Sequence, residues 1–127
     1  MKKEYALRLY TNRDGIEAVF KLWQNETVNI LLEANEEHSS NEMHTRLRAR
    51  DHDISRASVI NFLNGLSKAN LVTKREESAK GGYKGIYQIT DSRHWFDDKV
   101  VKIFCLKMFE AFPTIEWLKD IWEEEHA

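Results

Sequence analysis

The sequence predicts a mainly helical fold with one small β-hairpin, an α+β architecture with additional helices toward the C-terminal end. Apolar residues recur at helical spacing through most of the chain, which is typical of helices that bury one face. Residues 79–85 hold three of the five glycines and separate two short runs rich in β-branched and aromatic residues. Two such runs joined by a glycine-rich loop predict the hairpin.

The N-terminal part of the chain predicts one or two helices. A helix is expected to begin at an N-cap at Asn12 or Asp14. Its apolar positions follow the i, i+3, i+4, i+7 rhythm of one helical face: Ile16, Val19, Phe20 and Trp23. A second helical run ends near residues 34–35. The spacing leaves open whether these runs form two helices or one bent helix.

A helix-turn-helix is predicted between residues 39 and 70. Residues 39–42 read Ser-Ser-Asn-Glu, a capping box in which a serine hydroxyl accepts from the third amide while Glu42 reaches back. After a turn at residues 50–53, Ser55 is expected to cap a second helix that ends at Asn70 in a left-handed conformation. The positions expected to be buried in the two helices are Met43, Leu47, Val59, Leu63 and Leu66.

Two strands and two more helices are predicted after this motif. The strands are expected to begin at residues 71–73 and to return at residues 86–90, around the glycine-rich turn. Residues 91–112 predict a helix whose apolar side chains surround most of its circumference, and Pro113 ends it. A last amphipathic helix is expected at about residues 115–122.

Charge is distributed unevenly along a chain whose formal net charge is −2. Residues 43–90 hold nine Lys or Arg against four Asp or Glu, whereas residues 91–127 hold five against nine. A basic segment followed by an acidic one is typical of a nucleic-acid reader that carries a second module. The sequence therefore predicts a DNA-binding domain at residues 1–91 and a C-terminal helical element at residues 92–127.

Composition also argues against several classes of protein. No run approaches the roughly 18 uninterrupted apolar residues that a membrane span needs, and no apolar signal region follows the charged residues 2–4. The single cysteine, Cys105, rules out an internal disulfide framework. We therefore expect a cytoplasmic protein without membrane contact.

The second helix of the predicted motif is expected to present polar residues outward. Removing the buried repeat from residues 55–69 leaves Ser55, Arg56, Ser58, Ile60, Asn61 and Phe62. Arg56 can form two hydrogen bonds with guanine, and Asn61 can do the same with adenine. Serine hydroxyls can bind phosphates or bases, and the helix N-terminus attracts a phosphate. These features favour a helix that reads base edges in the major groove of DNA, although a solvated helix face has similar residues.

The glycine-rich turn is expected to support that helix on DNA. Lys80, Tyr83 and Lys84 lie among the glycines, so the backbone can approach DNA closely and the lysines add sequence-independent attraction. Arg46 and Arg50, near the end of the preceding helix, are candidate phosphate-binding residues. An exposed flexible turn and a set of solubilising arginines are the alternative interpretations.

Residues 26–90 resemble the winged helix-turn-helix regulators of the ArsR, MarR, PadR and penicillinase-repressor type. Residues 27–32 look like the helix that precedes the motif in that superfamily, and residues 54–59 look like the start of its recognition helix. Residues 81–90 are similar to its wing and the closing Tyr-x-x-Thr strand. Asn70 stands where many members have glycine, and asparagine also tolerates a left-handed conformation. The resemblance covers about half of the chain and identifies a superfamily.

The resemblance implies a homodimer on a palindromic operator, with dimer contacts formed by terminal helices. The apolar helix after residue 91 suits this role, because a chain this short offers little to cover the whole circumference. The predicted dimerisation residues are Trp95, Phe96, Val100, Phe104, Met108 and Phe112. Packing of this helix on the N-terminal helices is the alternative.

Two other functions stay open at the level of the sequence. The near-neutral net charge suits a winged-helix module that docks a protein and does not read DNA. Trp95, Phe96 and Trp117 could line a pocket for an unknown small-molecule effector at the dimer junction. No Cys or His spacing indicates a metal site, and no catalytic triad, nucleotide loop or carboxylate pair indicates an enzyme or a cofactor.

Overall fold

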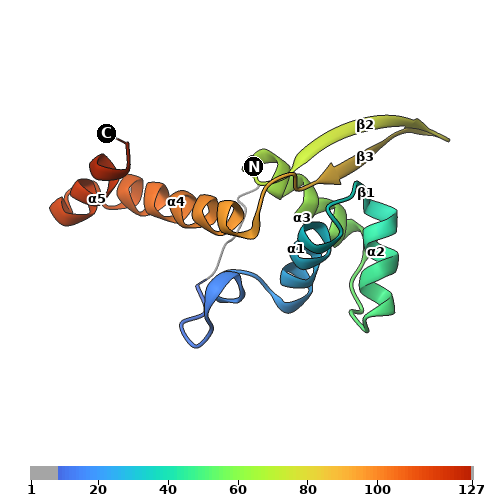
Figure 1. Cartoon of the computed structure of the whole chain (residues 1–127), viewed down its shortest axis with the longest axis horizontal. Coiled ribbons are helices and arrows are strands. Elements are labelled where there is room, and N and C mark those ends of the chain that lie inside the picture. The colour runs from blue at the N-terminus through green and yellow to red at the C-terminus, as the bar shows by residue number, and fades with distance from the viewer. Residues whose placement is uncertain (1–8, 127) are drawn as a thin grey trace. The chain divides into compact units, whose positions relative to one another are not determined.

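The chain is mainly helical and carries one small antiparallel sheet, as the sequence predicts (Figure 1). A computed structural model describes residues 9–126. These residues divide after Ser92 into two compact units, the first with the helix-turn-helix and the hairpin and the second with two helices. The elements of the first unit are η1 (Gly15–Ala18), α1 (Leu22–Ala34), β1 (His38–Ser39), α2 (Ser40–Ala49), α3 (Arg56–Lys68), β2 (Thr73–Ala79) and β3 (Gly82–Gln88).

The apolar pattern expected to form one helix from residue 16 is divided between two elements. Gly15 has a φ of +62°, and η1 is a single 3₁₀ turn that buries Ile16. The backbone is extended at Lys21, and α1 begins only at Leu22. The predicted continuous helical face is therefore wrong, because a short turn brings the same apolar residues to the core without helical spacing.

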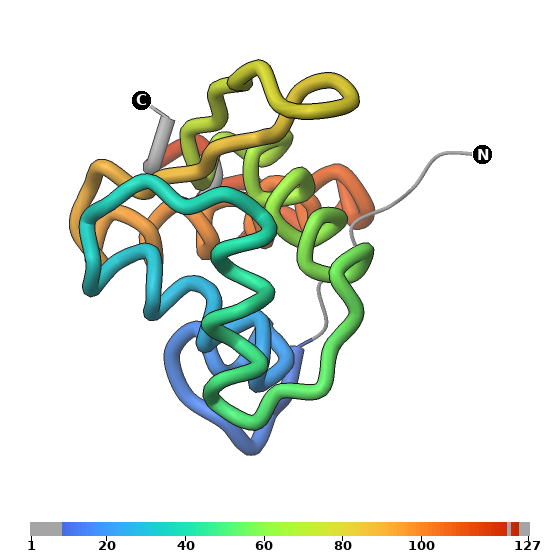
Figure 2. The backbone as a smooth tube through the Cα atoms, turned by 90° about the vertical axis from the view of Figure 1, so that its right-hand side faces the viewer, coloured from blue at the N-terminus to red at the C-terminus, as the bar shows by residue number. Residues whose placement is uncertain are grey.

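The helix-turn-helix is formed by α2 and α3, and the serine hydroxyls of both predicted N-caps are in place. The expected return bond from the Glu42 side chain is not among the hydrogen bonds of residues 9–126. The hydroxyl of Ser39 accepts a 3.2 Å hydrogen bond from the amide of Glu42, and the hydroxyl of Ser55 accepts one of 3.1 Å from the amide of Ser58. Figure 2 shows the chain leaving α2, turning and returning as α3. Asp51 provides a left-handed residue in this turn, with a φ of +65°. The N-caps thus set where both helices begin.

The core of the motif consists of the predicted apolar repeat. The buried residues of α2 and α3 include Met43, Leu47, Val59, Leu63 and Leu66, each 0% exposed. Full burial of such a side chain contributes about 1.5–3 kcal/mol relative to exposure. At the end of α3, Asn70 has a φ of +59°, and the amide of Leu71 donates to the carbonyl of Leu66 at 2.9 Å. This closes the helix with the predicted left-handed residue.

Phe62 lies in the core and does not face outward, which corrects the expectation for this position. Its side chain is 2% exposed. Its ring meets the ring of Phe20 edge-on, with 5.5 Å between the centroids, and that of Trp23 at 5.3 Å. The apolar repeat of α3 predicts Val59, Leu63 and Leu66 as its buried residues. Phe62 is buried by aromatic partners from the N-terminal segment, which that repeat does not include.

The sheet has three strands in the order β1-β3-β2, all antiparallel. The short strand β1 is absent from the sequence-based expectation, and it pairs His38 with Tyr87. The hairpin turn is shorter than expected: Ala79 pairs with Gly82, so only Lys80 and Gly81 connect the strands. Figure 1 shows β2 and β3 as a long curved ribbon, with β1 beside β3.

The second unit consists of α4 (Arg93–Ala111) and α5 (Glu116–His126). Pro113 follows the end of α4, as expected, and the two helices contact each other. Leu118 of α5 is buried, at 7% exposed. None of the helices formed within residues 9–126 combines the length and the apolar content needed to cross a membrane.

Candidate nucleic-acid interface

A polar cleft of about 240 Å³ lies between the helix-turn-helix and one face of the hairpin. Its lining comes from four elements that are distant in sequence. The lining residues are Ser40 of α2; Arg56, Ile60 and Asn64 of α3; Lys74 and Glu76 of β2; and Tyr83, Lys84, Gly85 and Tyr87 of β3. Three of the predicted DNA-binding residues, Arg56, Tyr83 and Lys84, therefore border the same cleft. The Lys84 ammonium, however, pairs with Glu77 on the other face of the hairpin.

The register of the hairpin decides which side chains face α3. Cross-strand partners share a face of an antiparallel sheet, and successive residues alternate between its faces. The pairs of one face are Lys74 with Tyr87, Glu76 with Gly85, and Ser78 with Tyr83. This face, called here the cleft face, is the one that reaches α3 through Tyr87.

Tyr87 forms the floor of the cleft. Its hydroxyl donates a 2.6 Å hydrogen bond to the side-chain oxygen of Asn64 on α3. Burial raises the pKa of the Tyr87 phenol, and the negative charge of Glu76 raises this pKa further. The phenol therefore stays protonated and remains a hydrogen-bond donor.

Gly85 leaves the space that the Tyr87 side chain occupies. A Cβ at position 85 would lie 2.7 Å from the Tyr87 hydroxyl oxygen and 3.0 Å from Cε of Lys74. The Lys74 ammonium stands 5.7 Å from the centroid of the Tyr87 ring, within the range of a cation–π contact. The absence of a side chain at Gly85 thus lets a tyrosine and a lysine pack closely on the cleft face.

The exposed start of α3 carries the residues predicted to read bases. Arg56 and Asn61 are exposed, and Arg56 also lines the cleft. The two predicted serines bond to each other, because the Ser55 hydroxyl donates to that of Ser58 at 2.8 Å. Ser55 has thus used its only hydroxyl proton within the helix cap, whereas Arg56, Ser58 and Asn61 still have side-chain protons to donate to DNA.

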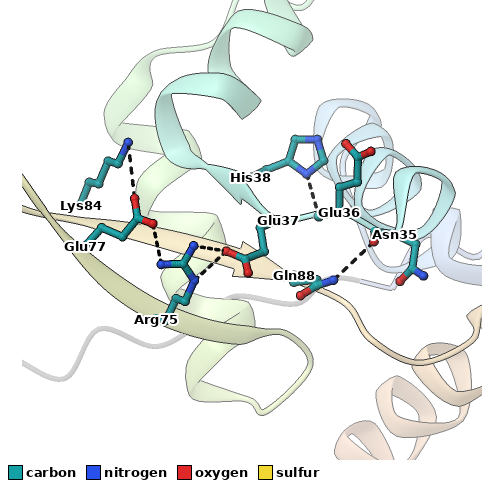
Figure 3. A network of polar contacts seen from close by, with 8 residues as sticks. All are labelled: Asn35, Glu36, Glu37, His38, Arg75, Glu77, Lys84 and Gln88. Carbon is teal, nitrogen blue, oxygen red and sulfur yellow. Dashed lines mark hydrogen bonds and ion pairs between the residues drawn. The ribbon is translucent and has the colours of Figure 1, made fainter.

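Lys84 is engaged on the face of the hairpin opposite to the cleft face (Figure 3). Its ammonium is 3.9 Å from a carboxylate oxygen of Glu77, and Glu77 also accepts a 2.7 Å hydrogen bond from Arg75. Arg75 in turn donates to Glu37, ahead of β1. The guanidinium of Arg75, followed by the charge of Lys84, lowers the pKa of the Glu77 carboxyl, and the pKa of Arg75 is raised. The charge of Lys84 is therefore partly neutralised.

The remaining predicted cations have different surroundings. Arg50 forms an ion pair with Glu26 of α1, which holds its guanidinium on the N-terminal helix. Arg46 is exposed on α2, and Lys80 is exposed at the hairpin tip. Neither of these two has an ion-pair partner within residues 9–126.

Sequence reasoning missed five polar residues of the cleft: Ser40, Asn64, Lys74, Glu76 and Tyr87. Lys74 and Tyr87 both fall within the strands expected from the sequence, but the sequence did not show which strand residues face α3. The register of β2 against β3 would have indicated both residues. Asn64 and Ser40 become visible only when α2, α3 and the hairpin are placed together.

The predicted dimerisation residues of α4 differ in exposure. Phe96 and Val100 are buried, at 0% and 4% exposed, whereas Trp95 and Phe104 are half-buried. Met108 and Phe112 are exposed, at 47% and 51%. Four further large apolar side chains are exposed on α4 and α5: Val101, Leu106, Trp117 and Ile121. The accessible apolar surface of these helices thus differs from the predicted set.

The cleft is rich in hydrogen-bond donors and contains no cluster suited to a metal ion. Among the residues that the structure describes, no group of three or more His, Cys, Asp or Glu side chains could hold a metal. Cys105 is a free, half-buried thiol. In comparisons with family models, characterised proteins and solved structures, no match to the chain was found.

Proposed function

We propose that this chain is a sequence-specific DNA-binding protein that regulates transcription in the cytoplasm, as a homodimer on a palindromic operator. The order of its elements supports this function, because a capped helix-turn-helix is followed directly by a hairpin. In such an arrangement the second helix enters the major groove and reads base edges with its N-terminal residues. We assign it no catalytic step and no cofactor.

The observation that carries the proposal is the shared cleft of α3 and the hairpin. Arg56 from α3 lines it together with Lys74 and Tyr83 from the hairpin. Tyr83 is 76% exposed, so a large aromatic side chain stands free beside the cations. A guanidinium at a helix N-terminus suits guanine, while a lysine on the adjacent hairpin suits the backbone phosphates. Base contacts and phosphate contacts would thus come from adjacent surfaces.

The proposed homodimer uses the exposed apolar stripe of α4. Val101 and Met108 of α4, and Phe112 directly after its last residue, lie at i, i+7 and i+11 and are 59%, 47% and 51% exposed. Residues at this spacing occupy one side of a helix, and an exposed apolar stripe of this length indicates an association surface. A two-fold dimer would place two α3 helices on two half-sites, which is why a palindromic operator is expected.

Selection from a random pool of duplex DNA, repeated at several salt concentrations, tests the proposal. The expected result is an enriched inverted repeat whose affinity falls as salt rises, because phosphate contacts release counterions. A pool without any enriched motif, together with binding that does not respond to salt, would refute sequence-specific DNA binding.

A protein-docking module is the second candidate, and the acidic residues of the hairpin favour it. Glu76 lines the cleft, Glu77 holds Lys84, and the formal net charge of the chain is −2. These carboxylates weaken the attraction for a polyanion. A failed DNA selection would favour this candidate.

A further inference from the structure

We infer that the cleft between α3 and the hairpin holds one phosphate group, bound by Ser40 and Lys74 with Asn64 and Arg56 beside them. If that phosphate belongs to a DNA backbone, the inference rests on the proposed function. It goes beyond the proposed function by assigning the phosphate-binding residues, since neither Ser40 nor Asn64 was expected to contact DNA.

Ser40 is a buried residue that supplies a hydroxyl at the edge of the cleft. It is the first residue of α2, it is 8% exposed, and it lines the cleft. Across residues 9–126 its hydroxyl has no hydrogen-bond partner, whereas the neighbouring Ser39 hydroxyl caps the helix. The start of α2 also carries the positive end of the helix dipole, which favours an oxyanion.

Asn64 presents donors because of its bond to Tyr87. The Tyr87 hydroxyl donates to Oδ1 of Asn64, so the amide oxygen is already engaged. The two protons on Nδ2 are left for an acceptor, and the half-buried Asn64 lines the cleft. A phosphate oxygen is an acceptor that these protons can meet.

Lys74 and Arg56 supply positive charge. The stem of Lys74 passes over Gly85, and its ammonium lies 5.7 Å from the centroid of the Tyr87 ring. Within residues 9–126 neither Lys74 nor Arg56 forms an ion pair. Both charges are therefore available to a ligand.

Glu76 is the one carboxylate of the cleft lining and opposes an anion there. Lys84 also borders the cleft, but its ammonium pairs with Glu77 on the other hairpin face. The charges of Arg56, Lys74 and Glu76 therefore leave a small positive charge in the cleft. A cleft of about 240 Å³ with a polar lining is small for a drug-sized organic ligand, whose pockets are larger and mostly apolar. A single phosphate fits within this volume and suits the donors that line it.

The phosphate can come from a DNA backbone or from a free phosphorylated molecule, and two probes distinguish these sources. The duplex arm uses the DNA selected above and compares Lys74→Gln, Ser40→Ala and Glu76→Gln with the wild type. The matched control is Lys68→Gln, which removes an exposed cation at the end of α3 that does not line the cleft. The second arm titrates inorganic phosphate into the ¹⁵N-labelled protein and follows the amides of Asn41 and Gly85.

In the duplex arm, Lys74→Gln is expected to weaken binding to all DNA sequences alike. It should also reduce the slope of log affinity against log salt concentration by about one unit. Ser40→Ala is expected to weaken binding, and Glu76→Gln to strengthen it, while Lys68→Gln has a smaller effect than Lys74→Gln. In the phosphate arm, saturable shifts are expected in the wild type and not in Lys74→Gln. Thermal unfolding of each variant verifies that it is folded.

The outcomes separate this inference from the proposed function. Duplex binding that is unchanged in all three cleft variants, without phosphate shifts, overturns the phosphate site and leaves the DNA-binding function standing. Saturable phosphate shifts without duplex binding support the site and identify a free phosphorylated molecule as its source, while DNA binding fails. Equal losses of duplex affinity in Lys68→Gln and Lys74→Gln would also overturn the site, because they would reflect only the loss of one positive charge from the protein.

Discussion

The hydroxyl of Tyr87 on β3 donates a 2.6 Å hydrogen bond to Oδ1 of Asn64 on α3, 23 residues earlier in the chain. It joins the hairpin directly to the second helix of the helix-turn-helix. Tyr87 is 2% exposed, so water competes little for this bond. A typical intramolecular hydrogen bond contributes about 0.5–1.5 kcal/mol to stability. The shape of the cleft therefore depends on a pair of residues that neither the helix pattern nor the strand pattern identifies.

Gly85→Ala is expected to destabilise the fold by about 1–3 kcal/mol, because the new Cβ would lie 2.7 Å from the Tyr87 hydroxyl oxygen. The tyrosine cannot move aside without losing its bond to Asn64. Urea denaturation measures the effect. Ser78→Ala, on the same hairpin face, is the control and should change stability by less than about 0.5 kcal/mol. Equal stability of the two variants would contradict the close packing at Gly85.

Phe62→Ala is expected to cost about 3–5 kcal/mol, as for other buried aromatic residues. The substitution removes the ring that packs against Phe20 and Trp23. The exposed neighbour Asn61 offers a matched control, and Asn61→Ala should stay within about 0.5 kcal/mol of the wild type. Thermal unfolding checks both, and a small effect of Phe62→Ala would mean that this side chain lies on the surface.

The ion pairs of Glu77 are expected to make hairpin stability depend on pH. Arg75 and Lys84 lower the pKa of the Glu77 carboxyl in the folded state, so the pairs stabilise above its unfolded-state pKa. This contribution is lost as the pH falls through the lowered folded-state pKa. The effect should be small and weaken with salt, since these side chains are exposed.

Hydrogen exchange of hairpin amides between pH 7 and 3 would measure this dependence, after correction for the intrinsic exchange rate. The hairpin amides should be better protected from exchange in the wild type than in Glu77→Gln at pH 7, and this difference should disappear as the solution becomes acidic. Parallel curves for the two proteins would contradict a stabilising role for these pairs. Arg75 stays charged throughout this range, because its pKa is raised.

Arg56→Ala is expected to relax base preference at one position of each half-site by about 1–3 kcal/mol. Lys80→Ala should instead weaken binding to all sequences alike, because we expect this lysine at the hairpin tip to contact the phosphate backbone. Lys84→Ala should have a smaller effect than Lys80→Ala, since Glu77 already pairs with Lys84. Binding of a panel of single-base operator variants distinguishes these patterns. If Arg56→Ala lowers the affinity for all operator variants equally, Arg56 does not read a base.

Met108→Glu is expected to shift the protein from dimer to monomer, because it places a charge in the exposed apolar stripe of α4. Met108 is 47% exposed, so the substitution should not disturb the folding of a single chain. Lys107→Gln, at an exposed position on the same helix, is the control. Sedimentation velocity measures the shift. A dimer that persists in Met108→Glu, and also in a chain truncated after Thr90, would place the interface elsewhere.

Sequence alone determined the local features of the helix-turn-helix. The caps at Ser39 and Ser55 and the left-handed Asn70 were predictable, because each depends on residues only a few positions away. The apolar repeat of α3 likewise follows from helical spacing. The hairpin was predictable as an element, but its register was not, since extending the strands to Ala79 and Gly82 changes which residues face α3.

Tertiary structure decided the contacts between distant segments. It buried Phe62, because Phe20 and Trp23 approach from the N-terminal segment. It separated Lys84 from Tyr83 by placing them on opposite hairpin faces, and it tied Arg50 to α1. Above all it placed Lys74 and Ser40 in one cleft with Arg56. Local patterns determine where helices and strands begin, whereas the surface they share depends on packing between residues that no short-range pattern connects.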